Sequence, residues 1–360
     1  MPDVVVIGAG AMGSATAWWL ARRGCEVVLL EQFEQGHRRG SSHGGSRIFR
    51  FAYADPEFVG MAQAALPLWR ELEDDAGTTL LDITGEVDHG DPHDVAAVAS
   101  ALALRGAAHE VLPADAAHER WPGMHFEGDV LFHPDGGRCR SDDTVRALQT
   151  RAAAHGADVR FETGPAVLRT TASGVEVDAA GETFRAPVAV VTAGAWVTDV
   201  VGSDALPAAV KVTQEQIQHF VPVVQGEWPS FIHHRRPWIY GLHTPGEGVK
   251  VAEHHVGAVV DPDNRPPRNI DAEATVVRYV EHWFPGLDPT PVHVAECLYT
   301  TTPDESFVLE RRGNVVIGSP CSGHGFKFTP LIGRRLADLA CPLPHPHPLP
   351  LPNPGSIAGP

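Results

Sequence analysis

The first thirty residues alternate between short apolar runs and a longer segment with helical spacing. Val4–Ile7 and Val27–Leu30 are continuous apolar runs, and glycines follow the first of them. Between the runs, apolar residues recur at helical spacing from Ala11 to Arg23, and Gly24 marks the C-terminal stop. This pattern predicts a strand, a helix and a second strand, and parallel strands of such a unit are buried on both faces.

The same mixture of periods continues along the chain. Residues 58–77 predict a helix with Leu66, Trp69 and Leu72 on one face. Residues 186–202 and 314–340 each read as an apolar strand, a glycine-rich turn and a helix. Short strand-like segments broken by Pro and Gly fill residues 210–295 and predict an antiparallel sheet. The pattern therefore indicates a mixed α/β fold.

Composition limits the partners of the chain. At 360 residues, 43% hydrophobic and 20% charged, it can form two or three packed modules. A formal net charge of −17 argues against nucleic acid and anionic membrane surfaces as partners. No apolar run approaches the roughly 20 residues of a membrane span, and the N-terminus has no basic signal-peptide region. We expect a cytoplasmic protein that binds neither nucleic acid nor membrane.

Cysteines and histidines are numerous, but their spacing predicts no metal site. The five cysteines are odd in number and scattered, which suits a reducing compartment rather than a disulfide framework. The twenty histidines include no HExxH spacing, and no CxxC pair occurs. The doublets His233-His234 and His254-His255 are not chelates in themselves, because adjacent strand residues point to opposite faces.

A glycine fingerprint lies between the first strand and the first helix. Gly8, Gly10 and Gly13 form GxGxxG, followed at the end of the second strand by Glu31. The glycines allow a tight turn, close approach of a pyrophosphate, and close packing of helix on strand. The helix N-terminus offers free N–H groups to phosphates, and the acid is placed to accept ribose hydroxyls. The motif predicts dinucleotide binding and does not distinguish FAD from NAD.

The segment GSSHGGSRIFRFAY, residues 40–53, suggests a second part of the site. Its glycine- and serine-rich start suits close approach to a cofactor, and Arg47 and Arg50 follow among apolar residues. A guanidinium carried inward needs an anionic partner, because a buried unpaired charge is costly. A substrate carboxylate or a flavin would provide one.

Five blocks together resemble the monomeric sarcosine oxidase family of flavoprotein amine oxidases, which includes N-methyltryptophan and pipecolate oxidases. They are VVVIGAGAMGSATAWWLARRG, GSSHGGSRIFRFAY, VVTAGAW, ECLYTTTPDESFVLE and SGHGFKF. The resemblance covers Val4 to about Ala340. It implies FAD, and a hydride transfer from a secondary amine or an N-substituted or cyclic amino acid to flavin N5. The resulting imine is hydrolysed, and O2 reoxidises the flavin to give H2O2.

The resemblance also assigns site residues. Cys297 matches the cysteine that forms a thioether with the flavin 8α-methyl, and Lys250 matches the lysine that activates oxygen. Arg50 and Lys327 match the pair that holds the substrate carboxylate, and Arg47 matches an arginine beside the flavin. Further active-site positions fall on Tyr240, His254, Tyr299 and His324. The implied cofactor-binding set is Gly8, Gly10, Ala11, Met12, Gly13, Glu31, Ser42, His43, Arg47, Gly194, Trp196, Cys297, Gly323, Gly325, Phe326 and Lys327.

The chain departs from the family pattern at three places. HGGSR stands where relatives commonly have an acidic residue before the arginine. FIHHRRPW, residues 231–238, is more cationic and aromatic than a sarcosine pocket, and permits a larger or more anionic substrate. Cys321 is a second thiol near the expected cofactor. No general base can be assigned from the sequence.

The resemblance implies a Rossmann-type FAD-binding domain interleaved with an antiparallel-sheet substrate domain. We assign residues 1–83, 140–208 and 296–340 to the first, 84–139 and 209–295 to the second, and 341–360 to a proline-rich, disordered tail. The expected protein is a monomer acting on a small-molecule amine. The alternatives are a biosynthetic imino-acid oxidase with a larger substrate, a NAD-dependent dehydrogenase, and a flavin-binding subunit without turnover.

Overall fold

The computed structural model describes residues 1–342. The predicted disordered tail therefore lies, from residue 343 onward, outside the described residues. The predicted opening unit is present as β1 (Val4–Ile7), α1 (Ala11–Arg22) and β2 (Val27–Leu30). Both strands are fully buried, as expected for a parallel sheet covered on both faces.

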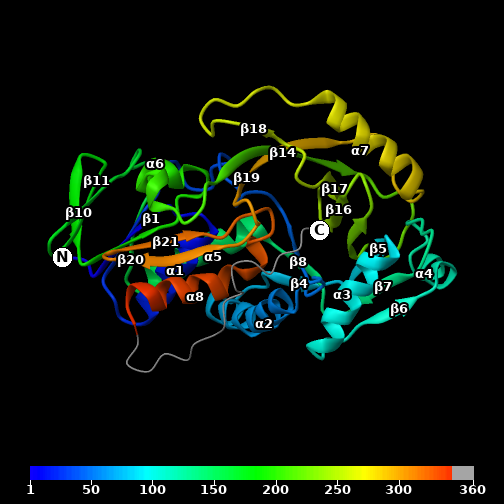
Figure 1. The fold of residues 1–360 in the computed structure, drawn as a ribbon, viewed down its shortest axis with the longest axis horizontal. Helices are drawn as coiled ribbons and strands as arrows, with labels where there is room; N and C mark the ends of the chain where they lie inside the picture. Colours follow the sequence, from blue (N-terminus) through cyan, green and yellow to red (C-terminus); the bar gives the residue numbers. More distant parts are fainter. Residues whose placement is uncertain (343–360) are drawn as a thin grey trace.

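A six-stranded sheet forms one half of the molecule (Figure 1). Its strand order is β20 (Val308–Arg312), β21 (Val315–Ser319), β13 (Val188–Val191), β1, β2 and β9 (Asp158–Arg160). All neighbours are parallel except β20 and β21. The helices α1, α5 (Ser141–Ala154) and α8 (Thr329–Ala340) pack together against this sheet. Segments distant in sequence thus build one dinucleotide-binding module.

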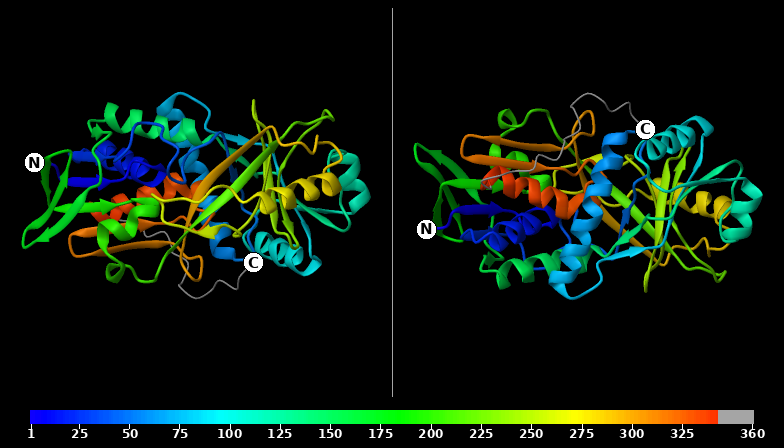
Figure 2. Two further views of the ribbon diagram at one scale, coloured as in Figure 1. Left: turned by 90° about the horizontal axis from the view of Figure 1, so that it is seen from above. Right: turned by 90° about the horizontal axis from the view of Figure 1, so that it is seen from below.

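A larger sheet forms the other half, and the views from above and below show the two halves side by side along the long axis (Figure 2). Its path is β18 (Ala258–Val259), β14 (Lys211–Phe220), β17 (Gly248–Glu253), β16 (Ile239–Thr244), β15 (Ser230–His234), β5 (Glu86–Gly90), β7 (Val130–His133) and β6 (Glu110–Leu112). β19 (His293–Thr301) also pairs with β14. The sheet is antiparallel as predicted, apart from the parallel pair β5 and β15.

The remaining elements connect and cover these sheets. One small sheet is β10 (Val167–Thr171), β11 (Gly174–Ala179) and β12 (Glu182–Ala186); the other is β3 (Arg47–Phe49), β8 (Gly137–Cys139) and β4 (Leu81–Ile83). The other helices are α2 (Pro56–Ala76), α3 (Pro92–Leu104), α4 (Ala114–Arg120), α6 (Val197–Val201) and α7 (Ile270–Trp283), with 3-10 turns η1 (Gly194–Trp196), η2 (Ser203–Ala205) and η3 (Phe326–Phe328). None of the described helices is both long and apolar enough to cross a membrane.

Two local expectations change in detail. In α2, Trp69 and Leu72 are buried as predicted, but Leu68 rather than Leu66 completes the buried face. The expected domain boundary at residue 296 falls inside β19. Because Cys297 and Tyr299 pair with β14, they belong to the larger sheet.

Candidate active site

A cavity of about 910 Å³ runs between the two halves of the molecule. It brings together segments from both sheets and from the loops that connect them. All but one of the predicted site residues line it: Gly8, Gly10, Ala11, Met12, Glu31, Ser42, His43, Arg47, Arg50, Gly194, Trp196, Tyr240, Lys250, His254, Cys297, Tyr299, Gly323, His324, Gly325, Phe326 and Lys327. Gly13 lies outside the lining, where α1 packs on the glycine loop.

The glycine loop is shaped for close approach at one end of this cavity. Gly8 has φ +96°, and a Cβ at Gly13 would lie 1.8 Å from the Gly8 carbonyl oxygen. Both positions therefore require glycine. The buried carboxylate of Glu31 accepts the N–H of Ala9 at 2.8 Å. The loop and the N-terminus of α1 thus present a preformed anion-binding surface, as the fingerprint predicts.

The segment after Gly40 forms a second wall of the cofactor end. Arg47 donates hydrogen bonds to the carbonyls of Ser41, His43 and Ser46 at 2.6–2.9 Å. Burial lowers the pKa of His43 to about 3, and the positive charge of Arg47 is the second largest cause. The buried His43 Nε2 has no hydrogen-bond partner within the described protein. An unpartnered polar atom in a residue that lines so large a cavity fits a bound polar cofactor such as FAD.

Cys297 and Tyr299 lie on the same side of β19 and both line the cavity. Burial raises the pKa of the Cys297 thiol to about 11, while nearby Arg47 and Lys250 act in the opposite direction. The Tyr299 hydroxyl is 3.1 Å from that of Tyr240. The other nearby thiol, Cys321, accepts the N–H of Thr300 through Sγ at 3.4 Å.

Lys250 points inward from β17 and is 3% exposed. Its Nζ donates to the Ser46 carbonyl at 2.6 Å. Burial lowers the pKa of Lys250 to about 7, and the positive charge of Arg47 is the second largest cause. Lys250 and Cys297 also influence each other's pKa through their charges.

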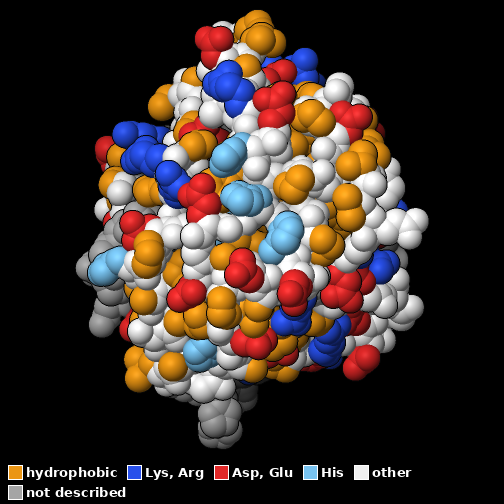
Figure 3. Space-filling view, turned by 90° about the vertical axis from the view of Figure 1, so that its right-hand side faces the viewer, with side chains coloured by type: hydrophobic (Ala, Val, Ile, Leu, Met, Phe, Trp, Pro, Cys, Tyr) orange, Lys and Arg blue, Asp and Glu red, His pale blue; other side chains and the backbone are white. Residues whose placement is uncertain are grey.

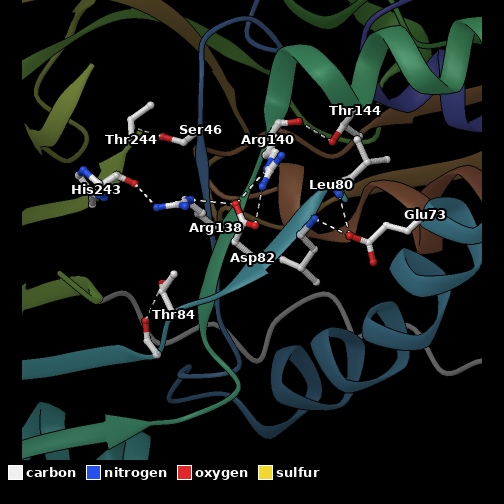
Figure 4. A network of polar contacts seen from close by, with 12 residues as sticks. Ser46, Glu73, Leu80, Asp82, Thr84, Arg138, Arg140, Thr144, His243 and Thr244 are labelled. Carbon is white, nitrogen blue, oxygen red and sulfur yellow. Dashed lines mark hydrogen bonds and ion pairs between the residues drawn. The ribbon is translucent and has the colours of Figure 1, made fainter. Parts of the chain in front are cut away.

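A polar network joins the small sheet β3–β8–β4 to the larger sheet (Figure 4). Arg138 donates to Asp82 and to the carbonyl of His243, both at 3.1 Å. The Ser46 hydroxyl contacts that of Thr244 at 2.5 Å. Because these contacts tie the Arg47 segment to the strand next to β17, they hold Arg47 and Lys250 in register.

Lys327 and Arg50 form a cationic end of the cavity. Lys327 Nζ donates to the Tyr53 hydroxyl at 2.6 Å and to the His324 carbonyl at 2.7 Å. Burial holds the pKa of Lys327 well below its usual range, and the positive charge of Arg50 is the second largest cause. The Arg50 guanidinium stacks 4.3 Å from the Tyr53 ring centroid. Both side chains carry N–H donors that are suited to bind a carboxylate.

The histidines expected in this region have different surroundings. His324 contacts the Tyr53 hydroxyl through Nδ1 at 3.1 Å. His254 packs edge-on against Tyr240 and Tyr299, with ring centroids 5.8 and 5.7 Å apart. Burial lowers the pKa of both histidines well below the usual value, so both are neutral walls of the cavity.

Sequence reasoning missed four residues that contact this end of the site. Tyr53 closes the motif GSSHGGSRIFRFAY but received no role. Glu86 and Asp88 are fully buried and each lies 3.9 Å from the Arg50 guanidinium. His234 contacts Asp88 at 2.6 Å. The available signal was two acids alternating along a strand, GEVDHG, at positions that a buried strand usually fills with apolar residues.

A possible metal-ligating group lies away from the cavity. Among the described residues, His125, Glu127 and His282 bring ligand atoms within 4.8 Å of one another. Glu127 is already paired with Arg235 at 2.7 Å. This group carries no part of the chemistry considered below.

On the end of the molecule shown in Figure 3, acidic, basic and histidine side chains are interspersed.

Comparisons with known proteins agree with this arrangement. The model of the family described as FAD dependent oxidoreductase matches residues 3–339. Monomeric sarcosine oxidase of Streptomyces avermitilis is 33% identical, over 94% of this chain and 93% of that protein. Peroxisomal sarcosine oxidase of Homo sapiens is 32% identical, over 95% and 92%. The open form of NikD, "an unusual amino acid oxidase essential for nikkomycin biosynthesis", superposes with a TM-score of 0.85 at 28% identity, over 94% of each chain.

Proposed function

The chain belongs to the FAD-dependent oxidoreductase family, and from this membership we propose that it is a sarcosine-oxidase-like amine oxidase. The observation that carries the proposal is one cavity lined by the glycine loop and also by Lys250, Arg50 and Lys327. FAD, when bound, accepts a hydride equivalent from the carbon beside the substrate nitrogen and passes the electrons to O2, giving H2O2.

The chain's own residues bind and orient the substrate. Arg50 and Lys327 hold the carboxylate of a secondary amine or an N-substituted or cyclic amino acid, which fixes the position of the reacting C–H bond. Tyr240, His254 and Tyr299 form an aromatic wall that limits water. Lys250 supplies a positive charge that stabilises negative charge developing on O2. The imine product is then hydrolysed by water.

Anaerobic mixing of the purified protein with a panel of amines tests this function. We expect N-methyl or cyclic amino acids to bleach the flavin absorbance, and the matched amines without a carboxylate to bleach it much more slowly. If dithionite reduces the flavin but no amine does, the proposed oxidase activity is wrong.

We further propose that Cys297 attaches the flavin covalently through its 8α-methyl. Three features support it: Cys297 lines the cavity, is buried, and lies near the charges of Arg47 and Lys250, which reduce the cost of losing the thiol proton. We expect acid precipitation to retain the yellow chromophore with wild-type protein and to release it from Cys297→Ser.

Cys321→Ser is the matched control for this attachment. It removes the other thiol of the cavity and should leave the chromophore in the precipitate. A chromophore that leaves the wild-type protein in acid, or that stays bound in Cys297→Ser, contradicts attachment at Cys297.

A cytoplasmic monomer remains our proposal for the protein's state. All five cysteines are free thiols, which is consistent with a reducing compartment. The Streptomyces relative carries the name monomeric. Sedimentation equilibrium of the holoprotein tests the oligomeric state.

A further inference from the structure

The strand pair β5 and β15 carries an acid pair that faces the active site. Their parallel register aligns Glu86 with Ser230 and Asp88 with Ile232. Ile232 and His234 both line the cavity. Because side chains alternate along a strand, Glu86 and Asp88 lie on the same face as these residues. His233 also belongs to the cavity lining, but its Nδ1 contacts the Tyr279 hydroxyl at 2.7 Å on the opposite face of the strand.

Asp88 connects His234 to the carboxylate-binding end of the cavity. Its Oδ1 is 2.6 Å from His234 Nε2 and 3.9 Å from Arg50 Nη1. Asp88 is fully buried, whereas the His234 side chain is 16% exposed. An ionised Asp88 accepts the Nε2–H, so the ring has the tautomer that leaves Nδ1 available to a ligand.

Glu86 completes the environment of this pair. Neither of its carboxylate oxygens has a hydrogen-bond partner within the described protein. Burial, reinforced by Asp88, raises the pKa of Glu86 well above the usual value. Of these two acids, Asp88 is the one whose carboxylate contacts the His234 ring.

We propose that His234, oriented by Asp88, accepts the proton of the substrate ammonium before the amine is oxidised. The inference rests on the proposed function. A substrate held by its carboxylate at Arg50 has its nitrogen two bonds from the carboxylate carbon, and Asp88 bridges Arg50 to the imidazole. His234 Nδ1 takes the N–H proton, and the nitrogen keeps the electron pair. The neutral amine is the form whose C–H bond can give up a hydride equivalent, which bound FAD would accept.

Other cavity histidines at this end are less suited to the role. His254 and His324 have pKa values lowered by burial and lie close to the cations Arg50 or Lys327. His324 also has both ring nitrogens in contact with Tyr53 and Glu305. Of the histidines near Arg50, His234 is the one that contacts a carboxylate.

Several charged and titratable groups belong to the elements around His234. They are Glu86, Asp88 and His89 of β5, Arg50 after β3, Asp94 of α3, and His233, Arg235 and Arg236 of its own segment. His89 and His233 are neutral, because burial lowers their pKa values. Asp88 makes the shortest printed contact with the ring.

The test measures anaerobic flavin reduction against pH in wild-type holoenzyme and in His234→Gln. In wild type, the rate constant of flavin reduction should rise with pH as His234 loses its proton. Any limb of the pH profile that comes from the substrate amine is recognised because it moves when the amine is changed. In His234→Gln the first limb should disappear and the rate constant at neutral pH should fall roughly 100-fold, a usual size for general base catalysis. His93→Gln, at an exposed histidine outside the cavity lining, should match wild type.

Two further readouts separate proton transfer from structure. Imidazole added to His234→Ala should restore part of the reduction rate. In ¹⁵N-histidine spectra, the resonance that is missing from His234→Gln identifies His234. In wild type this resonance should show the Nε2–H tautomer, and in Asp88→Asn it should change. An unchanged pH profile in correctly folded His234→Gln overturns the inference alone. Failure of every amine to reduce the wild-type flavin overturns both this inference and the proposed function.

Discussion

Replacing Lys250 by Met should slow flavin reoxidation by O2 roughly 100- to 1000-fold, the range typical of removing one preorganised electrostatic group. Reduction by the amine should change much less, because Lys250 contacts the Ser46 carbonyl and not the carboxylate-binding end. Stopped-flow mixing of reduced enzyme with O2 measures the first step, and anaerobic mixing with substrate measures the second.

The pH dependence of the same step follows from the Lys250 pKa of about 7. The ammonium form is the active one, so wild-type reoxidation should fall as pH rises through this value. Reduction of the flavin brings negative charge to the site. This charge favours the ammonium form of Lys250 and moves the limb of the pH profile to higher pH. Lys250→Met should lack the limb.

The exposed Lys211 provides the control for charge removal. Lys211→Met should reoxidise like wild type at every pH. If Lys250→Met reoxidises at the wild-type rate while its reduction is normal, the proposed role of Lys250 is wrong.

Replacing Gly13 by Ala should abolish FAD retention. The new Cβ would lie 1.8 Å from the Gly8 carbonyl oxygen and 2.5 Å from Thr192 Oγ1. Helix propensity alone predicts that this substitution increases stability, since Ala stabilises a helix interior by about 1 kcal/mol relative to Gly. The clash must move α1 away from β1, at a cost of about 2 kcal/mol for an overpacked core.

Gly128→Ala is the matched variant for this experiment. A Cβ there meets no heavy atom within 4 Å, so FAD content and melting temperature should remain at wild-type values. Absorbance ratios of the purified proteins and thermal melts give both quantities. A fully flavinylated Gly13→Ala protein with wild-type stability would show that the loop does not require glycine at this position.

Much of the cofactor end could be predicted because its determinants are local. A tight turn between a buried strand and a helix restricts Gly8, Gly10 and Gly13 to glycine, and these residues lie within one short segment. The periodicity of apolar residues likewise determined β1, α1 and β2 to within one residue at the helix end. The roles of Cys297, Lys250, Arg50 and Lys327 came from resemblance; the fold places all four along one cavity.

The substrate end depended on pairings that no local pattern specifies. Asp88 meets His234, which lies 146 positions away along the chain, because β5 pairs with β15. Sequence alone left the partner of Arg50 open between a substrate carboxylate and a flavin. The structure adds a buried acid pair as protein partners.

The sequence by itself therefore determined the element types, the glycine loop and the chemistry of the cavity's residues. Strand register decided which of these residues meet, including the placement of Cys297 on β19 opposite Glu215. A shift of one residue in register would turn Asp88 to the other face of its sheet. Register depends on packing across the whole core, so only the tertiary structure could specify it.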